Sequence, residues 1–384
     1  MSLSTKATSV TTTLVAVRVV NRLGAFAMGF LGVRLVRDLG ADLATASAVL
    51  TAFGLCTIPS RLLGGFLGRR HGTRTAMIAG LVGCAAAQFV IGVGPSLPVV
   101  VAGALLLGLA YEIIEPPTQA LLADSLDAER RAGGFALLWS AVAVAGVLAG
   151  VLAAVLAPLG VGALFLADAA TSCAAAALVA AALPRPVPHP PPGEPSAGGG
   201  TIERALLVWT AVGCLYATLF MITVFLLPLA VQASGRTPAT TGWLLAVAAA
   251  AGLPAQRLVA RWGRARPPAT LLTIGYLTFA AGLGAWALGT LPALVVGAAG
   301  VGASGTLLVG TQQAIASRLA PAGGTMTAMT VYGLSWGAGT VAAPVVGAPL
   351  LAHGPGVLWG TCSAAALCLA AGHALLMGRH HAHP

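Results

Sequence analysis

The sequence predicts an all-α integral membrane protein that crosses the bilayer twelve times. Of the 384 residues, 58% are hydrophobic and only 8% are charged, whereas a soluble domain carries about a quarter charged residues because its surface must be solvated. The apolar residues fall in continuous runs, and a run of about 20 is enough to cross a bilayer core. These runs exclude a transmembrane β-barrel, whose strands would alternate apolar and polar residues.

Twelve apolar runs follow one another, and each predicts one transmembrane helix. They cover residues 13–36, 44–66, 75–93, 98–121, 133–157, 163–183, 205–231, 240–260, 270–289, 293–316, 326–351 and 357–377. The segment PRPVPHPPPGEPSAGGGTIER (Pro184–Arg204) is rich in Pro, Gly and Ser, which predicts a solvated linker. We therefore expect an N-terminal six-helix bundle over 13–183, a cytoplasmic linker over 184–204 and a C-terminal six-helix bundle over 205–377.

The basic residues are distributed unevenly over the two sides of the predicted membrane. The loops on one side hold only Arg37 and Arg236. The other loops and the termini hold Lys6, Arg69, Arg70, Arg74, Arg130, Arg131, Arg185, Arg204, Arg261, Arg264, Arg266, Arg318 and Arg379. Because positive residues stay on the cytoplasmic side, both termini are expected in the cytoplasm. The membrane orientation thus accounts for the net charge of +10. The basic residues form no separate face for nucleic acid, which is therefore not an expected partner.

A preference for arginine over lysine, together with abundant Ala and Gly, is typical of a GC-rich bacterial genome. The expected location is therefore the bacterial cytoplasmic (inner) membrane, with the chain passing through it many times. The cysteines lie inside predicted spans without a CxxC spacing, so no metal site is predicted.

The two halves carry a matching loop. GGFLGRRHGTRT (Gly64–Thr75) follows the second span, and QRLVARWGRARP (Gln256–Pro267) follows the eighth. Two six-helix halves with matching loops are typical of duplicated transporter bundles.

Three segments give the chain a resemblance to the major facilitator superfamily (MFS), in its drug:proton antiporter or multidrug-efflux-like branch with twelve transmembrane helices. GFLGRRHGTR (Gly65–Arg74) resembles the signature loop of that family. YEIIEPPTQALLAD (Tyr111–Asp124), continued by Glu129-Arg130-Arg131, resembles the fourth span and its exit loop in multidrug-efflux members. GTVAAPVVG (Gly339–Gly347) resembles the eleventh span.

The resemblance implies an MFS fold in which two bundles give alternating access to one small-molecule site near the midplane, between the halves. It implies no cofactor, with the proton gradient as the energy source, and we expect a monomer. It also implies a cytoplasmic gate loop, formed by Gly65, Arg69, Arg70, Gly72, Arg74, Asp124 and Arg130.

The chain departs from the family pattern at two places. The signature-loop acid is replaced by Arg69 in the first copy and by Ala260 in the second, and Val151 replaces the final proline of the fifth-span antiporter motif. Because the usual latch carboxylate is missing, we expect Asp124 to pair with Arg69, Arg70 or Arg74 instead.

The first and fourth predicted spans each carry two charged residues. Arg18 and Arg22 are four residues apart, and Glu112 and Glu115 are three apart, so each pair shares a face of a continuous helix. A charge at a helix centre costs on the order of 2.5–3.5 kcal/mol and therefore faces a cavity or a partner. Both pairs lie in the cytoplasmic portion of spans that line the cavity in this family, so we expect the four charges to meet and nearly cancel.

Two interpretations of this cluster remain open. A carboxylate beside a guanidinium changes its protonation when its surroundings change, which would couple proton movement to transport. Alternatively, the charges form a static ion-pair network that holds two helices together.

Several other polar or aromatic residues lie inside predicted spans. Asp168 is expected to cap the start of the sixth span, with a role in coupling as the alternative. Arg61 and Arg257 are expected to snorkel to the membrane surface. The candidate substrate-lining residues are Asn21, Phe26, Gln119, Tyr216, Gln312 and Gln313. Hydrogen bonding between helices is an equally good explanation for the amides and the phenol.

A catalytic function has weak support in the sequence. GASG (Gly302–Gly305) and GLSWG (Gly333–Gly337) match serine-nucleophile patterns, and His373 lies in a later span. With 50 glycines, such matches arise by chance, and no catalytic base or oxyanion hole is evident. The protein is therefore not expected to be an enzyme, and an intramembrane serine protease is a remote alternative.

Taken together, the residues and the resemblance predict a secondary active transporter. The favoured function is proton-coupled export of a small amphipathic drug-like or natural-product compound. The alternative is a proton-coupled nutrient importer of the same fold.

Overall fold

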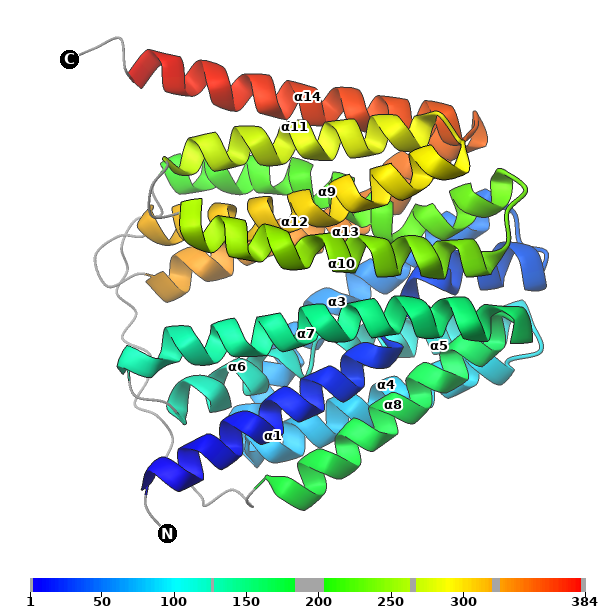
Figure 1. Cartoon of the computed structure of the whole chain (residues 1–384). Coiled ribbons are helices and arrows are strands. Elements are labelled where there is room, and N and C mark those ends of the chain that lie inside the picture. Colours follow the sequence, from blue (N-terminus) through cyan, green and yellow to red (C-terminus); the bar gives the residue numbers. More distant parts are fainter. Residues whose placement is uncertain (1–2, 126–127, 184–203, 263–266, 320–324, 381–384) are drawn as a thin grey trace. The chain divides into compact units, whose positions relative to one another are not determined.

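The computed structural model describes residues 3–125, 128–183, 204–262, 267–319 and 325–380, which form helices without a strand among them (Figure 1). Twelve helical segments of this described part are long and apolar enough to cross a membrane. The predicted all-α membrane fold is therefore confirmed. The chain divides into two compact units, Met1–Ala197 and Gly198–Pro384. The predicted linker, apart from Arg204, lies outside the described residues.

The N-terminal unit contains helices of very different lengths, because two of its spans are interrupted. In chain order they are α1 (Leu3–Gly24), η1 (Ala27–Phe30), α2 (Leu31–Val33), η2 (Arg34–Asp38), α3 (Leu43–His71), α4 (Thr73–Val93), α5 (Leu97–Tyr111), α6 (Glu115–Asp124), α7 (Ala128–Leu156), η3 (Ala157–Leu159) and α8 (Val161–Ala182).

The described part of the C-terminal unit contains six long helices. They are α9 (Arg204–Ala233), α10 (Pro238–Trp262), α11 (Pro268–Ala287), α12 (Leu291–Arg318), α13 (Thr325–Ala352) and α14 (Pro355–His380). Prolines inside α9, α10 and α13 do not end these helices.

The first span is a series of short helical pieces after Gly24. The α-helix α1 ends there, a 3₁₀ turn (η1) and the short helix α2 follow, and the π-helical η2 completes the span. The last piece is anchored by Arg34, whose guanidinium donates to the carbonyls of Gly92 (3.4 Å) and Gly94 (3.0 Å) at the end of α4. A guanidinium at this position satisfies carbonyls that the end of α4 leaves without helical partners.

The fourth span is interrupted between α5 and α6, at residues 112–114. The cause is Pro116, because a proline has no N–H to donate to the carbonyl four residues earlier and its ring collides with that carbonyl. The carbonyl of Glu112 instead accepts the N–H of Glu115 at 3.2 Å. The interruption approaches α3 closely, since a Cβ added to Gly64 would lie 2.5 Å from the carbonyl oxygen of Ile113.

The second and third spans meet in a very tight turn. The helix α3 continues to His71, α4 begins at Thr73, and Gly72 alone separates them with φ 85°. This left-handed conformation favours glycine. The segment predicted as a loop from Gly64 is therefore helical as far as His71.

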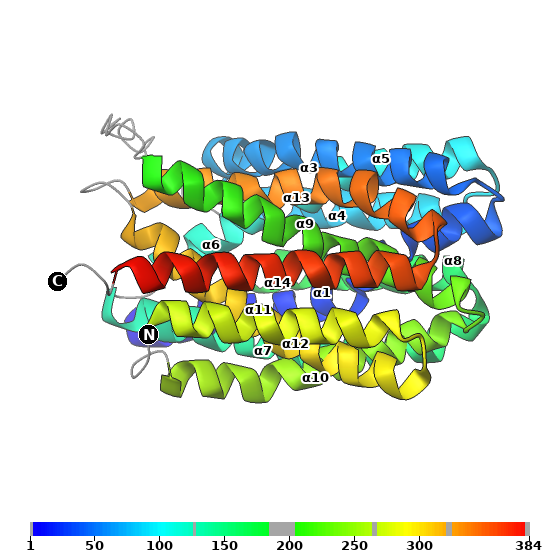
Figure 2. The same cartoon turned by 90° about the horizontal axis from the view of Figure 1, so that it is seen from above.

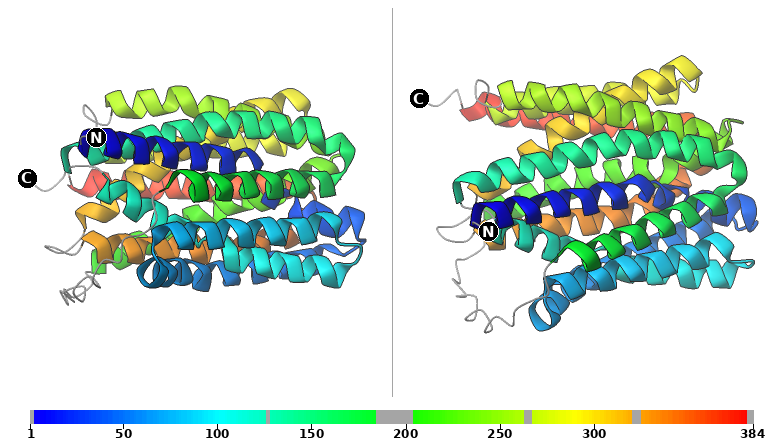
Figure 3. Two further views of the ribbon diagram at one scale, coloured as in Figure 1. Left: turned by 90° about the horizontal axis from the view of Figure 1, so that it is seen from below. Right: turned by 60° about the horizontal axis from the view of Figure 1, so that its bottom comes forward.

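Within the N-terminal unit, α1 lies against α7 and α8, and α4 packs along α8. Figure 3 shows α1 (dark blue) between α7 (teal) and α8 (green). Their shared core contains Leu14, Val17, Met77, Leu81 and Val179. This packing places the polar residues of α1, α4 and α8 next to one another.

Within the C-terminal unit, α9 packs along α13, and α11 packs between α12 and α14. Figure 2 shows α14 (red) beside α11. Large side chains such as Tyr216, Tyr276, Phe279 and Trp359 are fully buried.

Candidate functional site

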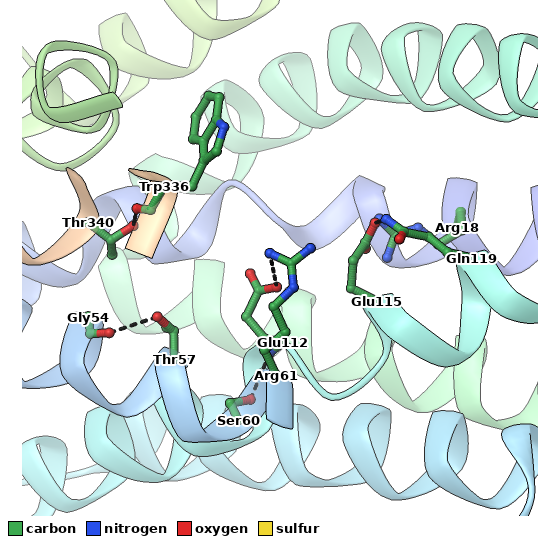
Figure 4. A network of polar contacts seen from close by, with 10 residues as sticks. All are labelled: Arg18, Gly54, Thr57, Ser60, Arg61, Glu112, Glu115, Gln119, Trp336 and Thr340. Atoms are coloured by element: carbon green, nitrogen blue, oxygen red, sulfur yellow. Dashed lines mark hydrogen bonds and ion pairs between the residues drawn. The ribbon is translucent and has the colours of Figure 1, made fainter. Parts of the chain in front are cut away.

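The interruption of the fourth span separates the two glutamates that the sequence places on one helix face. Glu112 follows the last residue of α5, and Glu115 is the first residue of α6. The backbone N–H of Glu112 donates to the Oγ of Ser60 in α3 at 3.0 Å. The continuous α-helix expected here is replaced by turns, in which the N–H of Ile113 donates to the carbonyl of Ala110 and the N–H of Glu115 to the carbonyl of Glu112, each at 3.2 Å. Each glutamate contacts a different arginine (Figure 4).

Glu115 is held by two donors, one on each carboxylate oxygen. The Nη2 of Arg18 lies 2.9 Å from Oε2, and the Nε2 of Gln119 donates to Oε1 at 2.9 Å. The side chains of Arg18 and Glu115 are only 15% and 19% exposed. The carboxylate also lies at the N-terminus of α6, where the helix dipole favours negative charge. The predicted contact between the first and fourth spans is thus present and links α1 to α6.

Glu112 faces a residue of the second span. The Nη1 of Arg61 lies 3.9 Å from the Oε2 of Glu112, and the two side chains are 49% and 27% exposed. This ion pair is longer and more exposed than that of Arg18 and Glu115. The guanidinium of Arg61 is thus directed at Glu112, rather than serving only as the snorkelling group expected from the sequence.

Arg22 does not join either glutamate. Among the described residues it forms no ion pair, and Tyr111, Arg18 and Asp168 are the ionisable groups with which it interacts electrostatically. The expectation that all four charges meet is therefore wrong for Arg22. One turn along α1 moves its side chain away from the fourth-span glutamates and toward α8.

Asp168 is more than one turn inside α8, which begins at Val161, and only 3% of its surface is exposed. A residue at this position cannot cap the helix, so the predicted capping role is wrong. Asn21, a candidate substrate-lining residue, lies in the same region. Its Nδ2 donates to the Oγ of Ser172 at 3.4 Å, and that hydroxyl donates to the Oε1 of Gln88 at 3.3 Å. Asn21 thus hydrogen-bonds between helices, and Phe26 is buried where the first span is interrupted.

The C-terminal unit contains an aromatic–amide cluster centred on Gln312. The Nε2 of Gln312 donates to the hydroxyl of Tyr276 at 2.7 Å, and its Oε1 accepts from the hydroxyl of Tyr332. Its backbone carbonyl accepts from the Nε1 of Trp209 at 3.1 Å. Gln312 is fully buried, so hydrogen bonding between helices is the role that its contacts show.

The other two C-terminal candidates differ in their exposure. Gln313 is exposed, and Tyr216 is fully buried with no hydrogen-bond partner for its hydroxyl in the described part of the chain. Edge-on contacts surround the ring of Tyr216, with centroid distances of 5.9 Å to Tyr276 and 5.8 Å to Phe279.

The residues predicted to form the gate loop have different surroundings. Gly65 lies inside α3, and Arg69 and Arg70 are exposed at its end, where Arg70 lies over the ring of Phe66 at 5.8 Å. Arg74 donates to the carbonyl of Ala180 near the end of α8. The side chains of Asp124 and Arg130 lie outside the described part of the structure, and so does the predicted pairing of Asp124.

The serines of the two nucleophile-like patterns are bonded within their own helices. Ser304 donates to the carbonyl of Val301 at 2.8 Å, and Ser335 donates to that of Tyr332 at 2.6 Å. The Nδ1 of His373 lies 2.8 Å from the carbonyl of Leu369. A carbonyl only accepts, so this nitrogen carries the proton. A serine hydroxyl that donates to a carbonyl of the preceding turn is a common arrangement within a helix.

A family model described as Major Facilitator Superfamily matches residues 14–270. The chain belongs to this superfamily. No curated protein matches the chain in sequence.

Solved structures of superfamily transporters have the same fold. The nucleoside transporter NupG is 12% identical, with a TM-score of 0.78 over 95% of this chain and 99% of that one. A peptide transporter POT is 16% identical, with a TM-score of 0.77 over 99% and 98% of the two chains. The POT-family transporter PepTSo is 14% identical, with a TM-score of 0.78 over 98% and 99%. At these identities the likeness shows the fold alone.

Membership of the superfamily defines the class of function. The protein is a multi-pass membrane protein and a secondary transporter rather than an enzyme, and its substrate is a small molecule. The direction of transport and the substrate do not follow from the superfamily alone.

Several residues of the site do not stand out in the sequence. Ser60 and Gln88 are ordinary polar residues of membrane helices, and only the packing of α3 and α4 brings them to Glu112 and Ser172. The pairing of Arg61 could have been predicted from the sequence. It lies ten residues before the end of α3, and an arginine inside a membrane helix needs a partner such as a carboxylate.

Proposed function

We propose that this superfamily transporter exports a small amphipathic drug-like or natural-product compound in exchange for protons, and that Glu112 and Glu115 exchange the coupling proton. The observation that carries the proposal is the placement of two arginine-bound glutamates at the interruption of the fourth span. Ionisable residues inside membrane helices are costly, and they mark ion and proton pathways more often than packing sites.

The distribution of acidic residues supports a coupling site in the N-terminal unit. After Glu203 the sequence contains no Asp or Glu. Any carboxylate that carries a proton through the membrane interior must therefore come from the first six spans. Away from the span ends, these carboxylates are Glu112, Glu115 and Asp168.

The geometry of Glu115 suggests how proton binding follows conformation. Arg18 is on α1 and Gln119 is on α6, so a movement of α1 against α6 separates the carboxylate from its cation but not from its amide. A carboxylate without a neighbouring cation binds a proton more readily. Residues 112–114 form turns between α5 and α6, and they offer a hinge for such a movement. Substrate binding that favours one conformation would then change proton occupancy.

Export is supported by the resemblance of Tyr111–Asp124 to the fourth span of multidrug-efflux members. Proton-coupled import is the second candidate, because the solved structures of the same fold include nucleoside and peptide transporters. We further propose that the proton gradient is the only energy source, that the protein acts as a monomer in the bacterial inner membrane, and that both termini are cytoplasmic. The uneven distribution of the loop arginines supports this orientation.

The test compares compound susceptibility in a bacterium that lacks its own exporters. Cells carry the wild type or the Glu112→Gln/Glu115→Gln variant at equal membrane levels, and they are exposed to ethidium, rhodamine and chloramphenicol. We expect the wild type to raise the inhibitory concentration of at least one compound several-fold. We expect the variant to lose this protection, and a protonophore to abolish it in wild-type cells.

A matched control distinguishes loss of coupling from loss of folding. Asp42→Asn removes an exposed acid outside the spans and should retain the protection at an equal membrane level. Equal protection by the wild type and the double glutamine variant would show that the glutamates are structural. If cells with the wild type instead accumulate radiolabelled dipeptides or nucleosides in a proton-dependent manner, import is correct and export is wrong.

A further inference from the structure

Asp168 is a buried carboxylate whose position the proposed glutamate site does not explain. Its surface is 3% exposed, and it lies inside α8 between α1 and α4. A carboxylate inside a membrane helix requires a partner or a function. Among the described residues, none forms an ion pair with Asp168.

The hydrogen bonds around Asp168 run in one direction. Asn21 of α1 donates to Ser172 of α8, and Ser172 donates to the Oε1 of Gln88 in α4. Since the Oε1 of Gln88 is an acceptor in this series, the Nε2 amide remains to donate, and Gln88 hydrogen-bonds the carboxylate of Asp168. The series therefore ends at Asp168 and presents an N–H group to it. An N–H group cannot bind a metal cation, so the surroundings suit a carboxylate or a carboxylic acid rather than an alkali-ion site.

The end of α1 leaves room for this carboxylate. Gly24 is the last residue of α1, and a Cβ added there would lie 2.5 Å from the Oδ1 of Asp168. Any larger residue at position 24 would displace the carboxylate. The first span is interrupted immediately after this contact, so a change in the interruption would reach Asp168 directly.

The ionisable groups that face Asp168 come from the helices packed around it. They are Arg22 of α1, Cys84 of α4 and Tyr111 at the end of α5. Arg22 is the only cation among them, its side chain is exposed, and it makes no ion pair with a described residue. Arg22 and Asp168 are thus opposite charges that interact electrostatically without forming an ion pair.

We propose that Asp168 is a second proton-binding site of the N-terminal unit, separate from Glu112 and Glu115. An approach of Arg22 favours the ionised carboxylate of Asp168, and the carboxylate takes a proton from water when the arginine turns away. Only an O–H bond forms, and the charge of the carboxylate is neutralised. This inference goes beyond the proposed function, since it requires neither export nor a particular substrate.

The test is pH-difference infrared spectroscopy of the full-length protein in lipid, which detects the C=O stretch of protonated carboxyl groups. We expect a band in the wild type that grows as the pH falls. Asp168→Asn should remove one component of this band. Glu112→Gln/Glu115→Gln should leave that component in place, and this distinguishes failure of the present inference from failure of the proposed function.

Further variants test whether the infrared component belongs to Asp168 even if one variant fails to fold. Asp42→Asn removes an exposed acid outside the spans and should leave the component unchanged. If Asp168→Asn does not fold, Asp168→Glu should retain the component at a shifted frequency. The inference is overturned if neither substitution at position 168 alters the band. It is also overturned if replacing choline by sodium removes the component, because Asp168 would then bind an alkali ion.

Discussion

Glu115 has two donors on different helices, so replacing one donor is more informative than replacing the glutamate. Arg18→Gln should leave Glu115 in a largely apolar environment without its cation. Breaking a fully buried pair costs about 3–5 kcal/mol, and the 15–19% exposure of this pair reduces that cost. We expect a lower unfolding temperature for the purified protein and loss of transport.

The double variant Arg18→Gln/Glu115→Gln distinguishes a structural from a functional ion pair. Removing both charges should restore most of the thermal stability, because no unpaired charge remains. Transport should stay low if Glu115 carries a proton. Full recovery of transport in the double variant would show that the pair only holds α1 against α6.

Asp42 lies outside the spans, so the effect of its titration can be separated from that of the acids inside the spans. It precedes α3 and accepts the backbone N–H of Thr45 at 2.7 Å. Hydrogen bonds from the side chain and backbone of Thr45 lower the pKa of Asp42. Because the pKa in the folded protein is below the unfolded value of about 3.9, the contribution of this cap is complete above that value. It is lost as the pH falls through the lower, folded pKa.

Asp42→Asn should therefore leave the pH profile of transport unchanged between about pH 5 and pH 8, since asparagine also caps helices. The measurement is substrate efflux from loaded vesicles at stepped external pH. A shifted profile in this variant would place a coupling group in the 39–42 connection instead of in the membrane interior.

At the residue scale, the sequence predicts the charges but only part of their pairing. Arg18 and Glu115 meet as expected, because α1 and α6 are in contact. Glu112 pairs with Arg61 of α3, because the turn at residues 112–114 lies against that helix. The partners of Asp168 come from α1 and α4, and their rotation about the helix axes is set by packing that no single segment encodes.

At the element scale, hydropathy predicts the spans well, while the interruptions depend on local chemistry. All twelve spans appear near their predicted positions, because length and apolar content determine what crosses a membrane. The interruption of the fourth span has a visible cause in Pro116 and Pro117. The first span lacks a proline, and its interruption after Gly24 accompanies close packing against Asp168 and Thr171 of α8.

The interruption of the fourth span depends on a close approach that can be tested with paired glycine substitutions. Gly64→Ala places a Cβ 2.5 Å from the Ile113 carbonyl oxygen, whereas at Gly68 the nearest atom would be 3.9 Å away. In a helix, Gly→Ala alone favours folding by about 1 kcal/mol, but overpacking costs about 1–3 kcal/mol. We expect Gly64→Ala to lower the unfolding temperature and Gly68→Ala to preserve or raise it. Equal effects would contradict the close approach of residues 112–114 to α3.

At the scale of the whole molecule, the two units share a six-span layout but differ in chemistry. The N-terminal unit carries the buried acids and the interrupted spans, and the C-terminal unit carries the aromatic–amide cluster around Gln312. The matching loops of the sequence predict this shared layout. The difference in chemistry follows from the absence of Asp and Glu after Glu203. Proton binding by carboxylates is accordingly proposed only for the first unit.

The loop arginines predict the orientation of the whole chain. Green fluorescent protein fused after Pro384 should fluoresce, because it folds in the cytoplasm. Alkaline phosphatase fused after Pro95, in the connection between α4 and α5, should be active outside. The opposite result would show that the chain has the reverse orientation in the membrane. Glu112 and Glu115 would then lie in the outer half of the fourth span.

The most direct test of the central claim measures proton movement and substrate movement together. Wild type and Glu112→Gln/Glu115→Gln are reconstituted into vesicles that contain a pH-sensitive dye, and a compound against which the wild type protects cells is added. We predict that the wild type moves protons opposite to the compound, and that the variant moves neither against a gradient. Undiminished proton-coupled transport by the variant would contradict the assignment of the coupling proton to the fourth-span glutamates.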